Sequence, residues 1–389
     1  MAAFALSLKR ELSHLKKDKG DLFLTLGMMP LLCVFIWWIF SAGQPDSLPV
    51  AVVDYDQTSI SRQFIRLADA APGIALVHGS IDHAEAIDAL RKRKVYAVLV
   101  VPKGFEAEVF SGTPADLVLQ VNSQYSTYSS TIERHLSGAA LTAGVAIGLE
   151  RLQMQGIFID AGLAMAMPIS VNATPLFNEG PDYEVFLAAT LIPALFHIIA
   201  MILVVSAVGR ELRDGTAGQW LQTAENSLAI ALSAKVLPFF IVINLYSALF
   251  IIYFQQLAPQ SYSGNILNIW LTMVLMNSAA IAMGLLIVAA TRNFRMGLSL
   301  AGFYSAPAFA YSGQAFPLVA MPDAAQYWAS ILPLTHWLQI YNQLWMSGAP
   351  MSAVYQPLAI LLAMLVVASG LGFWLLSRFA FKPESWGAR

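Results

Sequence analysis

The chain has 389 residues, of which 57% are hydrophobic and only 12% are charged, and its formal net charge is −2. Soluble domains carry roughly 25% charged residues, so this composition indicates an integral membrane protein. The near-neutral balance, without a basic arm, argues against nucleic acid as a partner. The single cysteine, Cys33, excludes an intramolecular disulfide and a cysteine-based metal site.

The first forty residues predict an amphipathic helix followed by a membrane-spanning helix. Over residues 3–19, lysine and arginine surround apolar side chains at helical spacing, and these side chains are Phe4, Leu8, Leu12 and Leu15. Such a helix suits the inner surface of a membrane; the charged start of a signal sequence is the alternative. Residues 22–40 are an apolar run of spanning length. We therefore expect an interfacial segment (1–20) and an uncleaved first membrane helix (21–43).

Residues 44–183 differ in character, because short β-rich runs alternate with helical runs. The expected strands cover 48–54, 74–77, 95–101 and 117–122, and the expected helices cover 58–70, 81–94 and 103–110. This order predicts a compact α/β domain with a largely covered sheet. A long helix rich in alanine and glycine is expected from Ser126 to about Gln155, and a loop over 165–180.

Five further apolar runs bring the predicted number of membrane helices to six. They cover 185–208, 228–254, 266–290, 296–311 and 354–379, and the fourth of these is short and contains Pro307. With the N-terminus inside, the short inside segments contain lysine and arginine, whereas the outside segments 255–265 and 312–353 contain neither. The positive-inside rule thus places both termini, including the tail 381–389, in the cytoplasm and residues 44–183 in the periplasm.

Motifs for independent chemistry are absent from the sequence. It contains neither the phosphate-binding pattern G-x-x-x-x-G-K-[ST] nor the zinc pattern H-E-x-x-H. We therefore expect no enzyme activity, no cofactor and no metal in this chain.

A few polar residues interrupt the apolar runs of the predicted membrane region (184–380). His197, Asn244 and Asn277 lie deep in their runs, and such residues either mark a functional cavity or form hydrogen bonds between helices. Lys235 lies near the start of its run, from which it is expected to reach back to the cytoplasmic interface. The acidic residues Glu179, Asp182 and Glu184 precede the second helix, where attraction of cationic substrates and a solvated helix start are equally good interpretations.

Two segments between the runs stand out. Residues 312–350 are aromatic and broken by prolines, which predicts short helices that dip into the outer leaflet and place tryptophan and tyrosine rings at the interface. Residues 210–224 form a charged stretch between two apolar runs. This stretch is either a solvated turn or a cytoplasmic surface that receives force from a partner protein.

At four places the sequence resembles an ABC-2 type exporter permease of the subgroup with a large periplasmic insertion. The matching stretches are Val50–Asp56 with Ser61-Arg62; Val95–Phe105; Arg210-Glu211 with Gly215-Thr216, Leu221, Thr223 and Lys235; and Tyr311–Gly313 with Phe316-Pro317, Met321-Pro322 and Pro333–His336. Two departures occur in the third stretch, where Arg213 stands in place of a second glutamate and Ala224 in place of a proline.

The resemblance implies the transmembrane subunit of an ATP-driven exporter with six transmembrane helices, similar to type V ABC exporters. A separate ATPase, which holds ATP and Mg, would dock on the cytoplasmic face and push on the N-terminal helix and the loop 210–227. In that loop the Glu211 carboxylate would pair with basic groups of the partner. The implied coupling residues are Arg210, Glu211, Gly215, Thr216, Trp220 and Leu221, of which Trp220 and Leu221 would fill an apolar notch.

The resemblance also implies a second permease copy or a paralogue, which would enclose a path lined by the second and fifth membrane helices. The implied path residues are His197, Asn244, Asn277, Phe303 and Tyr304, and those of the outer re-entrant segment are Gly313, Pro317, Pro322, Pro333 and His336. A periplasmic adaptor and an outer-membrane channel are implied partners in the bacterial inner membrane. The implied cargo is hydrophobic or amphipathic: a drug, lipid or secondary metabolite. A non-transporting receptor or scaffold that displays residues 44–183 is the alternative, and an ion-coupled transporter using His197 is a weaker one.

Overall fold

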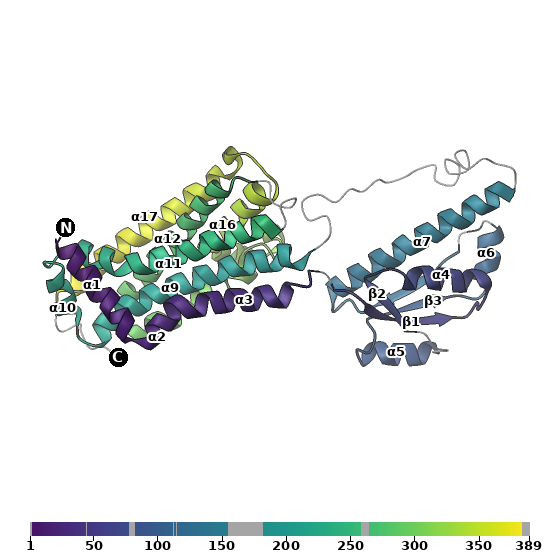
Figure 1. Cartoon of the computed structure of the whole chain (residues 1–389), viewed down its shortest axis with the longest axis horizontal. Helices are drawn as coiled ribbons and strands as arrows, with labels where there is room; N and C mark the ends of the chain where they lie inside the picture. The colour runs from purple at the N-terminus through teal and green to yellow at the C-terminus, as the bar shows by residue number, and fades with distance from the viewer. Residues whose placement is uncertain are drawn as a thin grey trace. The chain divides into compact units, whose positions relative to one another are not determined.

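The computed structural model describes residues 2–43, 45–77, 82–111, 113, 115–154, 182–257 and 264–382 (Figure 1). The chain divides into two compact units. The first, which we call the helical unit, comprises Met1–Gly43 and Pro175–Arg389, and the second, the α/β unit, comprises Gln44–Thr174. The loop expected over 165–180 lies outside the described residues.

Among the described residues of the helical unit, five helical stretches are long and apolar enough to cross a membrane. The first stretch joins α2 (Lys19–Leu22), the π-helix η1 (Phe23–Gly27) and α3 (Met28–Phe40). The second joins the π-helix η2 (Glu184–Ala188) and α9 (Ala189–Arg213); α11 (Leu228–Leu257) and α12 (Ile266–Thr291) follow, and the 3-10 helix η5 (Met351–Val354) leads into α17 (Tyr355–Phe379). These stretches coincide closely with five of the six predicted runs.

The remaining run, 296–311, is divided in the structure. Helix α13 covers Phe294–Ser305, and a separate short helix, α14, covers Ala308–Tyr311. Pro307 lies between them, and proline has no N–H to continue a helical ladder. A 12-residue helix such as α13 rises about 18 Å, whereas the hydrocarbon core of a bilayer is about 30 Å thick. The number of six membrane helices therefore stays a prediction.

Helix α12 contacts α9, α11 and α17, and glycines allow its close approach to two of them. A Cβ added at Gly284 of α12 would lie 2.8 Å from the carbonyl oxygen of Met201 in α9. A Cβ added at Gly372 of α17 would lie 3.1 Å from the backbone nitrogen of Leu286 in α12. Small residues at such positions bring helix backbones together, which is a main source of helix association in membranes.

The proline-rich segment 312–350 forms short helices whose starts coincide with its prolines. Pro317 precedes the 3-10 helix η3 (Leu318–Ala320), Pro322 precedes α15 (Asp323–Ser330), and Pro333 is the first residue of α16 (Pro333–Ile340), where its fixed φ is favourable. The π-helix η4 (Tyr341–Met346) follows. The expected interfacial position of the rings is wrong for three of them, because Trp337, Tyr341 and Trp345 are buried in the core of the helical unit.

Helix α1 (Ala2–Lys17) packs on the helical unit by a face that differs from the predicted apolar one. Its buried residues are Ala3, Ser7, Glu11 and Leu15, which follow one another at intervals of four. Leu12, expected on the apolar face, is 44% exposed. The helix therefore turns Glu11, a carboxylate, toward the protein, where it pairs with Arg210 and Lys235.

In the α/β unit the strands β1 (Leu48–Asp54), β2 (Ile74–Val77), β3 (Ala97–Val101) and β4 (Val118–Val121) form one sheet in the order β2-β1-β3-β4. β1 pairs in parallel with β2 and β3, and β4 is antiparallel to β3. The connecting helices are α4 (Ser59–Asp69), α5 (His83–Arg91) and α6 (Phe105–Ser111), and α7 (Ser126–Met154) follows the last strand (Figure 1).

Alternate residues of β1 pack on opposite faces of this sheet. Val50 and Val52 lie in a cluster with Phe64 of α4 and Ile132 of α7. Ala51 and Val53 lie in a second cluster, which includes Ala86 of α5. Since both faces are covered, the central strands are continuous apolar runs, and the unit has a hydrophobic core of its own.

Candidate functional site

Buried and partly buried charged side chains gather where α1 crosses the C-terminal end of α9 and the N-terminal part of α11. We call this set the charge cluster; its members are Arg10, Glu11, Asp21, Arg210, Glu211 and Lys235. It includes two of the residues that the sequence singled out for coupling. The cluster adjoins a short helix, α10 (Ala217–Thr223), that follows α9 after a tight turn.

Glu211 is the acceptor at the centre of the charge cluster. Both guanidinium nitrogens Nη1 and Nη2 of Arg10 donate to its carboxylate, at 2.7 and 2.9 Å. Lys235 Nζ donates to its Oε1 at 2.9 Å, and Thr216 Oγ1 donates to its Oε2 at 2.6 Å. The side chain is only 4% exposed. The carboxylate thus joins α1, α11 and the turn before α10 to the end of α9.

A second carboxylate, Glu11, makes the reciprocal contacts from α1. Arg210 Nη2 donates to Glu11 Oε1 at 3.0 Å, and Lys235 Nζ donates to Glu11 Oε2 at 2.6 Å. Arg210 also pairs with Asp21 of α2. Lys235 therefore lies between two carboxylates from different helices, and its ammonium is 5.2 Å from the centre of the Trp220 ring.

The charges of the cluster balance, with three cations and three carboxylates. Burial makes each charge costly unless it is paired, so removal of one partner leaves an uncompensated charge. At Arg10, burial lowers the pKa of the guanidinium, but the hydrogen bonds and charge of Glu211 outweigh it and raise this pKa overall. The cluster is thus stable only while α1, α9 and α11 stay together.

This geometry corrects three expectations. Glu211 is not free to pair with a partner protein, because it is buried and already accepts hydrogen bonds from this chain. Trp220 and Leu221 are each 2% exposed and fill a notch of their own chain, where Trp220 Nε1 donates to the Ala231 carbonyl at 3.3 Å. Lys235 does not reach back to an interface, since its side chain is 1% exposed. The reason is the same in each case: the sequence around a residue does not show which other residues of the folded chain it contacts.

The exposed part of this region is the turn after α9 and the outer face of α10. Gly215 adopts φ +66, a conformation that favours glycine, and a Cβ added there would meet open space. It allows the Thr216 N–H to donate to the Glu211 carbonyl at 3.0 Å. Gln219 and Gln222, three residues apart on α10, are exposed. The charge cluster therefore holds a short helix whose outer face is available to another molecule.

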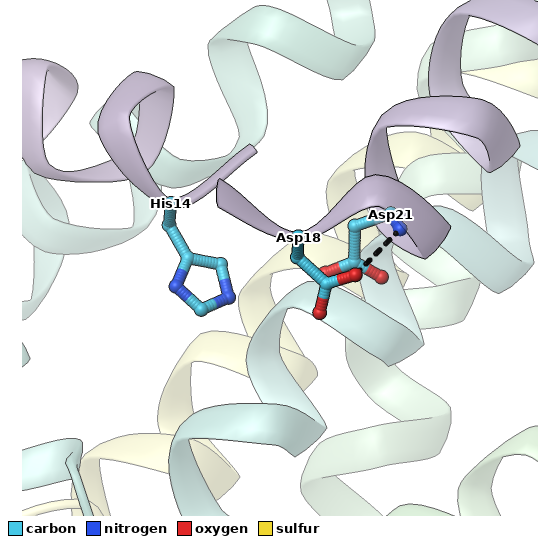
Figure 2. Close-up of side chains that lie close together, drawn as sticks. All are labelled: His14, Asp18 and Asp21. Carbon is cyan, nitrogen blue, oxygen red and sulfur yellow. Dashed lines mark hydrogen bonds between the residues drawn. The ribbon is translucent and has the colours of Figure 1, made fainter. Parts of the chain in front are cut away.

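Asp21 of the charge cluster lies close to His14 and Asp18, with one potential ligand atom from each of the three residues within 4.8 Å of the others (Figure 2). Asp18 Oδ1 accepts the backbone N–H groups of Gly20 and Asp21, at 2.9 and 3.1 Å, and Asp21 is paired with Arg210. Burial, and then the nearby Arg210 charge, lower the pKa of His14. Since Arg210 already supplies the cation for Asp21, we interpret His14 and Asp18 as neighbours of the charge cluster and not as a metal site.

The polar residues predicted to line a path fall into separate places. Asn277 Nδ2 donates to Asn244 Oδ1 at 3.0 Å and to Ser247 Oγ at 2.9 Å, which joins α12 to α11. This is the hydrogen-bonding interpretation of these asparagines. His197 of α9 is fully buried, and neither ring nitrogen has a hydrogen-bond partner among the described residues.

The other residues predicted for the path and the outer segment lie around α13–α16. Phe303 is 69% exposed, Tyr304 is 6% exposed and donates its hydroxyl proton to the Ile331 carbonyl, and both rings contact Trp328. His336 is buried, and its Nε2 lies 2.8 Å from the Ser330 carbonyl oxygen. Gly313 adopts φ +87 against Leu318. No hydrogen bond or ring contact of the described residues joins these side chains to His197, Asn244 or Asn277.

The sequence interpretation missed three members of the charge cluster: Arg10, Glu11 and Asp21. A signal for Glu11 was present, since it is an acidic residue within a basic helix and lies four residues from both Ser7 and Leu15. Lys235 inside an apolar run was the complementary signal, because a buried lysine requires a carboxylate partner. Neither signal indicates which pairs form.

The fold and the charge cluster describe a multi-pass membrane protein in which α1 is anchored to α9 and α11. The matching family model, described as ABC-2 family transporter protein, covers residues 19–374. The chain therefore belongs to the ABC-2 transporter family and is the permease component of an ABC transporter. Permeases of this family work with a separate ATP-binding subunit.

Curated relatives are permeases of the same kind. The chain is 21% identical to the linearmycin resistance permease protein LnrN of Bacillus subtilis (strain 168), over 93% of this chain and 96% of that protein. It is 22% identical to the probable multidrug ABC transporter permease YbhS of Escherichia coli (strain K12), over 82% of each chain. With the probable permease YbhR of that strain it shares 25% identity over 47% of this chain and 49% of the relative.

Proposed function

We propose that this permease exports a hydrophobic or amphipathic compound from the cytoplasm or the inner membrane. The names of the relatives, which refer to linearmycin resistance and to multidrug transport, support a drug-like or lipid-like cargo. The separate ATP-binding subunit docks on the outer face of α10. The observation that carries this proposal is the charge cluster, which ties α10 to α1, α9 and α11 through Glu211.

The proposed arrangement places α1 and the α9–α11 turn in the cytoplasm and the α/β unit in the periplasm, with 296–311 completing six membrane helices. A second copy or a paralogue completes the transport path, and an adaptor with an outer-membrane channel carries the cargo onward. ATP binding brings two ATPase subunits together and pushes on α10. Because the charge cluster joins α10 to two spanning helices and α1, this push moves those helices as one group.

The direction of transport is tested with the permease and its ATPase reconstituted in proteoliposomes. With the ATPase outside, ATP should drive accumulation of a fluorescent amphipath, such as rhodamine 6G, inside the vesicles. Docking is tested by the double substitution Gln219→Arg and Gln222→Arg on the exposed face of α10. We expect loss of both ATPase co-purification and transport.

The matched control is Gln356→Arg, at an exposed position near the start of α17. It should co-purify the ATPase as the wild type does. Normal co-purification and transport with the α10 double substitution would show that the ATPase docks elsewhere. ATP-driven loss of the dye from loaded vesicles would contradict the proposed direction.

A further inference from the structure

A pocket outside the charge cluster opens between α3, α9 and α11. Its volume is about 340 Å³, and its lining is almost wholly apolar. Aromatic rings dominate it, including Trp37 of α3, Phe196 of α9 and Tyr253 of α11. Trp37 and Tyr253 are 36% and 41% exposed, and they meet edge to face with ring centres 6.3 Å apart. The pocket thus opens on the surface of three membrane-spanning stretches.

A carboxylate borders the pocket at Tyr253. Glu184, the first residue of η2, accepts a hydrogen bond of 3.4 Å from the Tyr253 hydroxyl. Glu184 is only 6% exposed, and among the described residues no lysine, arginine or histidine forms an ion pair with it. All three carboxylates of the charge cluster have such a cation. A buried carboxylate without a cation is costly, and a ligand that brings a positive charge would remove that cost.

We propose that this pocket binds an amphipathic cation, with the apolar body among the aromatic rings and the positive charge near Glu184. Two physical attractions act on such a ligand. A cation is attracted to the faces of tryptophan and tyrosine rings, and it is attracted to the carboxylate more strongly than in water because the surroundings have a low dielectric constant. This assignment rests on the proposed export function and specifies a substrate class for it.

The composition of the pocket argues against other occupants. An anion would meet the Glu184 carboxylate without a cationic side chain to compensate, and a neutral hydrocarbon would leave that carboxylate unpaired. Ligand sites commonly combine an apolar lining with a small number of placed polar groups, and here that group is Glu184 with Tyr253. A lipid chain and a second copy of this chain are the alternative occupants of the same face, and the test below separates both from a cation.

The test measures direct binding to the permease–ATPase complex in lipid nanodiscs without ATP, with empty nanodiscs subtracted. The probes are radiolabelled tetraphenylphosphonium and tetraphenylborate, which have the same shape and opposite charge. We expect the cation to bind at least roughly tenfold more tightly than the anion. Glu184→Gln should weaken binding of the cation by roughly tenfold or more without weakening that of the anion. A purely structural role of Glu184 would change both affinities alike.

One further variant in the pocket and two matched controls locate the site. Cys33 lines the pocket, so Cys33→Trp should fill it and weaken binding of the cation. The matched controls are Leu362→Trp, at a 53% exposed position of α17, and Asp323→Asn, which neutralises an exposed carboxylate of α15; both should bind the cation as the wild type does. Equal affinity for the two probes, or an unchanged affinity for the cation in Glu184→Gln, would overturn the proposal. So would a loss of cation binding in the two controls that equals the loss in the pocket variants. Lipid or a second copy of this chain would then remain as the candidate occupant.

Failure of the pocket proposal can be distinguished from failure of the export proposal. Binding as described, without ATP-driven accumulation of any probe in proteoliposomes, would contradict export and leave the pocket assigned. ATP-driven accumulation of rhodamine 6G that is unchanged by Glu184→Gln and Cys33→Trp, together with no cation binding, would contradict the pocket and leave export assigned.

Discussion

Glu211 shows how a single residue connects parts of the chain that are far apart in sequence. It accepts hydrogen bonds from Arg10, Thr216 and Lys235, and it has almost no contact with solvent. Asp214, three residues later, pairs with its neighbour Arg213 and is 42% exposed. The two carboxylates belong to the same charged stretch, but only the loss of the Glu211 carboxylate would leave uncompensated charge inside the protein.

Neutralising Glu211 should therefore destabilise the helical unit. Glu211→Gln leaves an excess of buried positive charge, and breaking a buried ion pair costs about 3–5 kcal/mol. Asp214→Asn removes an exposed pair, which contributes about 0–1 kcal/mol. The free energy of unfolding in mixed detergent micelles checks this difference. Equal stability of the two variants would mean that the cluster does not hold α1 to α9 and α11.

The same residue shows what sequence can and cannot predict about the site. The chain order of Arg210, Glu211, Gly215 and Thr216 was enough to select this stretch as special. It did not show that Glu211 is internal, because its partner Arg10 lies 201 residues away in sequence. Hydropathy identifies an apolar run from local composition, whereas an ion pair between distant residues depends on the packing of helices. We therefore assign the proposed docking of a partner to the exposed face of α10 and not to Glu211, which is buried.

In the α/β unit, Asp56 holds the start of α6. Its carboxylate accepts the N–H groups of Gly104 at 2.8 Å and Glu106 at 3.0 Å, and the Thr58 hydroxyl at 2.6 Å. The hydrogen bond from Thr58, followed by those from the backbone, lowers the pKa of Asp56 from its ordinary value of 3.8. A carboxyl with a lowered pKa in the folded state stabilises that state above its unfolded pKa.

This stabilisation should be present at neutral pH and be lost as the pH falls below 3.8 through the lower folded pKa. A fragment of residues 45–154, which contains the core of the α/β unit, allows the measurement by urea unfolding followed by circular dichroism. Asp56→Asn should lower the unfolding midpoint at pH 7 and reduce its fall toward pH 3. Asp116→Asn, outside the contacts of Asp56, is the control. An identical pH dependence in wild type and Asp56→Asn would contradict the assigned contacts.

At the scale of elements, the sequence predicts the ranges of the membrane-spanning helices well, but it predicts only part of where and how helices break or turn. The apolar runs fixed the ranges of α9, α11, α12 and α17 closely, because each spanning helix needs about twenty apolar residues in sequence. Pro307 indicated where the run 296–311 divides. The buried face of α1 was not predictable from periodicity, since the residue that orients it is Glu11, whose partners lie on α9 and α11.

The packing of α12 gives a prediction at this scale. Alanine favours a helix over glycine by about 1 kcal/mol. Gly370→Ala of α17 should therefore be neutral or stabilising, because the added Cβ meets nothing within 4 Å apart from the adjoining backbone of its own helix. Gly284→Ala of α12 should destabilise instead, because its Cβ would lie 2.8 Å from the backbone oxygen of Met201. Thermal unfolding of the two purified variants in detergent checks the opposite signs. A stabilising Gly284→Ala would show that α9 and α12 are not in close contact.

At the scale of the whole molecule, the chain combines a helical unit with an α/β unit, each with a hydrophobic core of its own. The two units differ in the solvent they require. The helical unit exposes large apolar side chains along its spanning stretches, such as Trp38 at 67% and Val366 at 60%, which suits contact with lipid. The α/β unit instead carries charged surface residues such as Lys92, whose side chain is 61% exposed. The α/β unit therefore belongs in water, on one side of the membrane that the helical unit spans.

The proposed topology predicts which side each segment faces. Lysine and arginine occur in segments 1–20 and 210–227 and are absent from 312–353, and short basic segments remain in the cytoplasm. Cys33→Ser removes the only cysteine, and Lys17→Cys or Lys92→Cys then places one thiol at an exposed position of α1 or at the end of α5. A membrane-impermeant maleimide applied to spheroplasts should label Lys92→Cys and should label Lys17→Cys only after lysis. The reverse pattern would place the α/β unit in the cytoplasm, and α10 would then lie on the side without ATP.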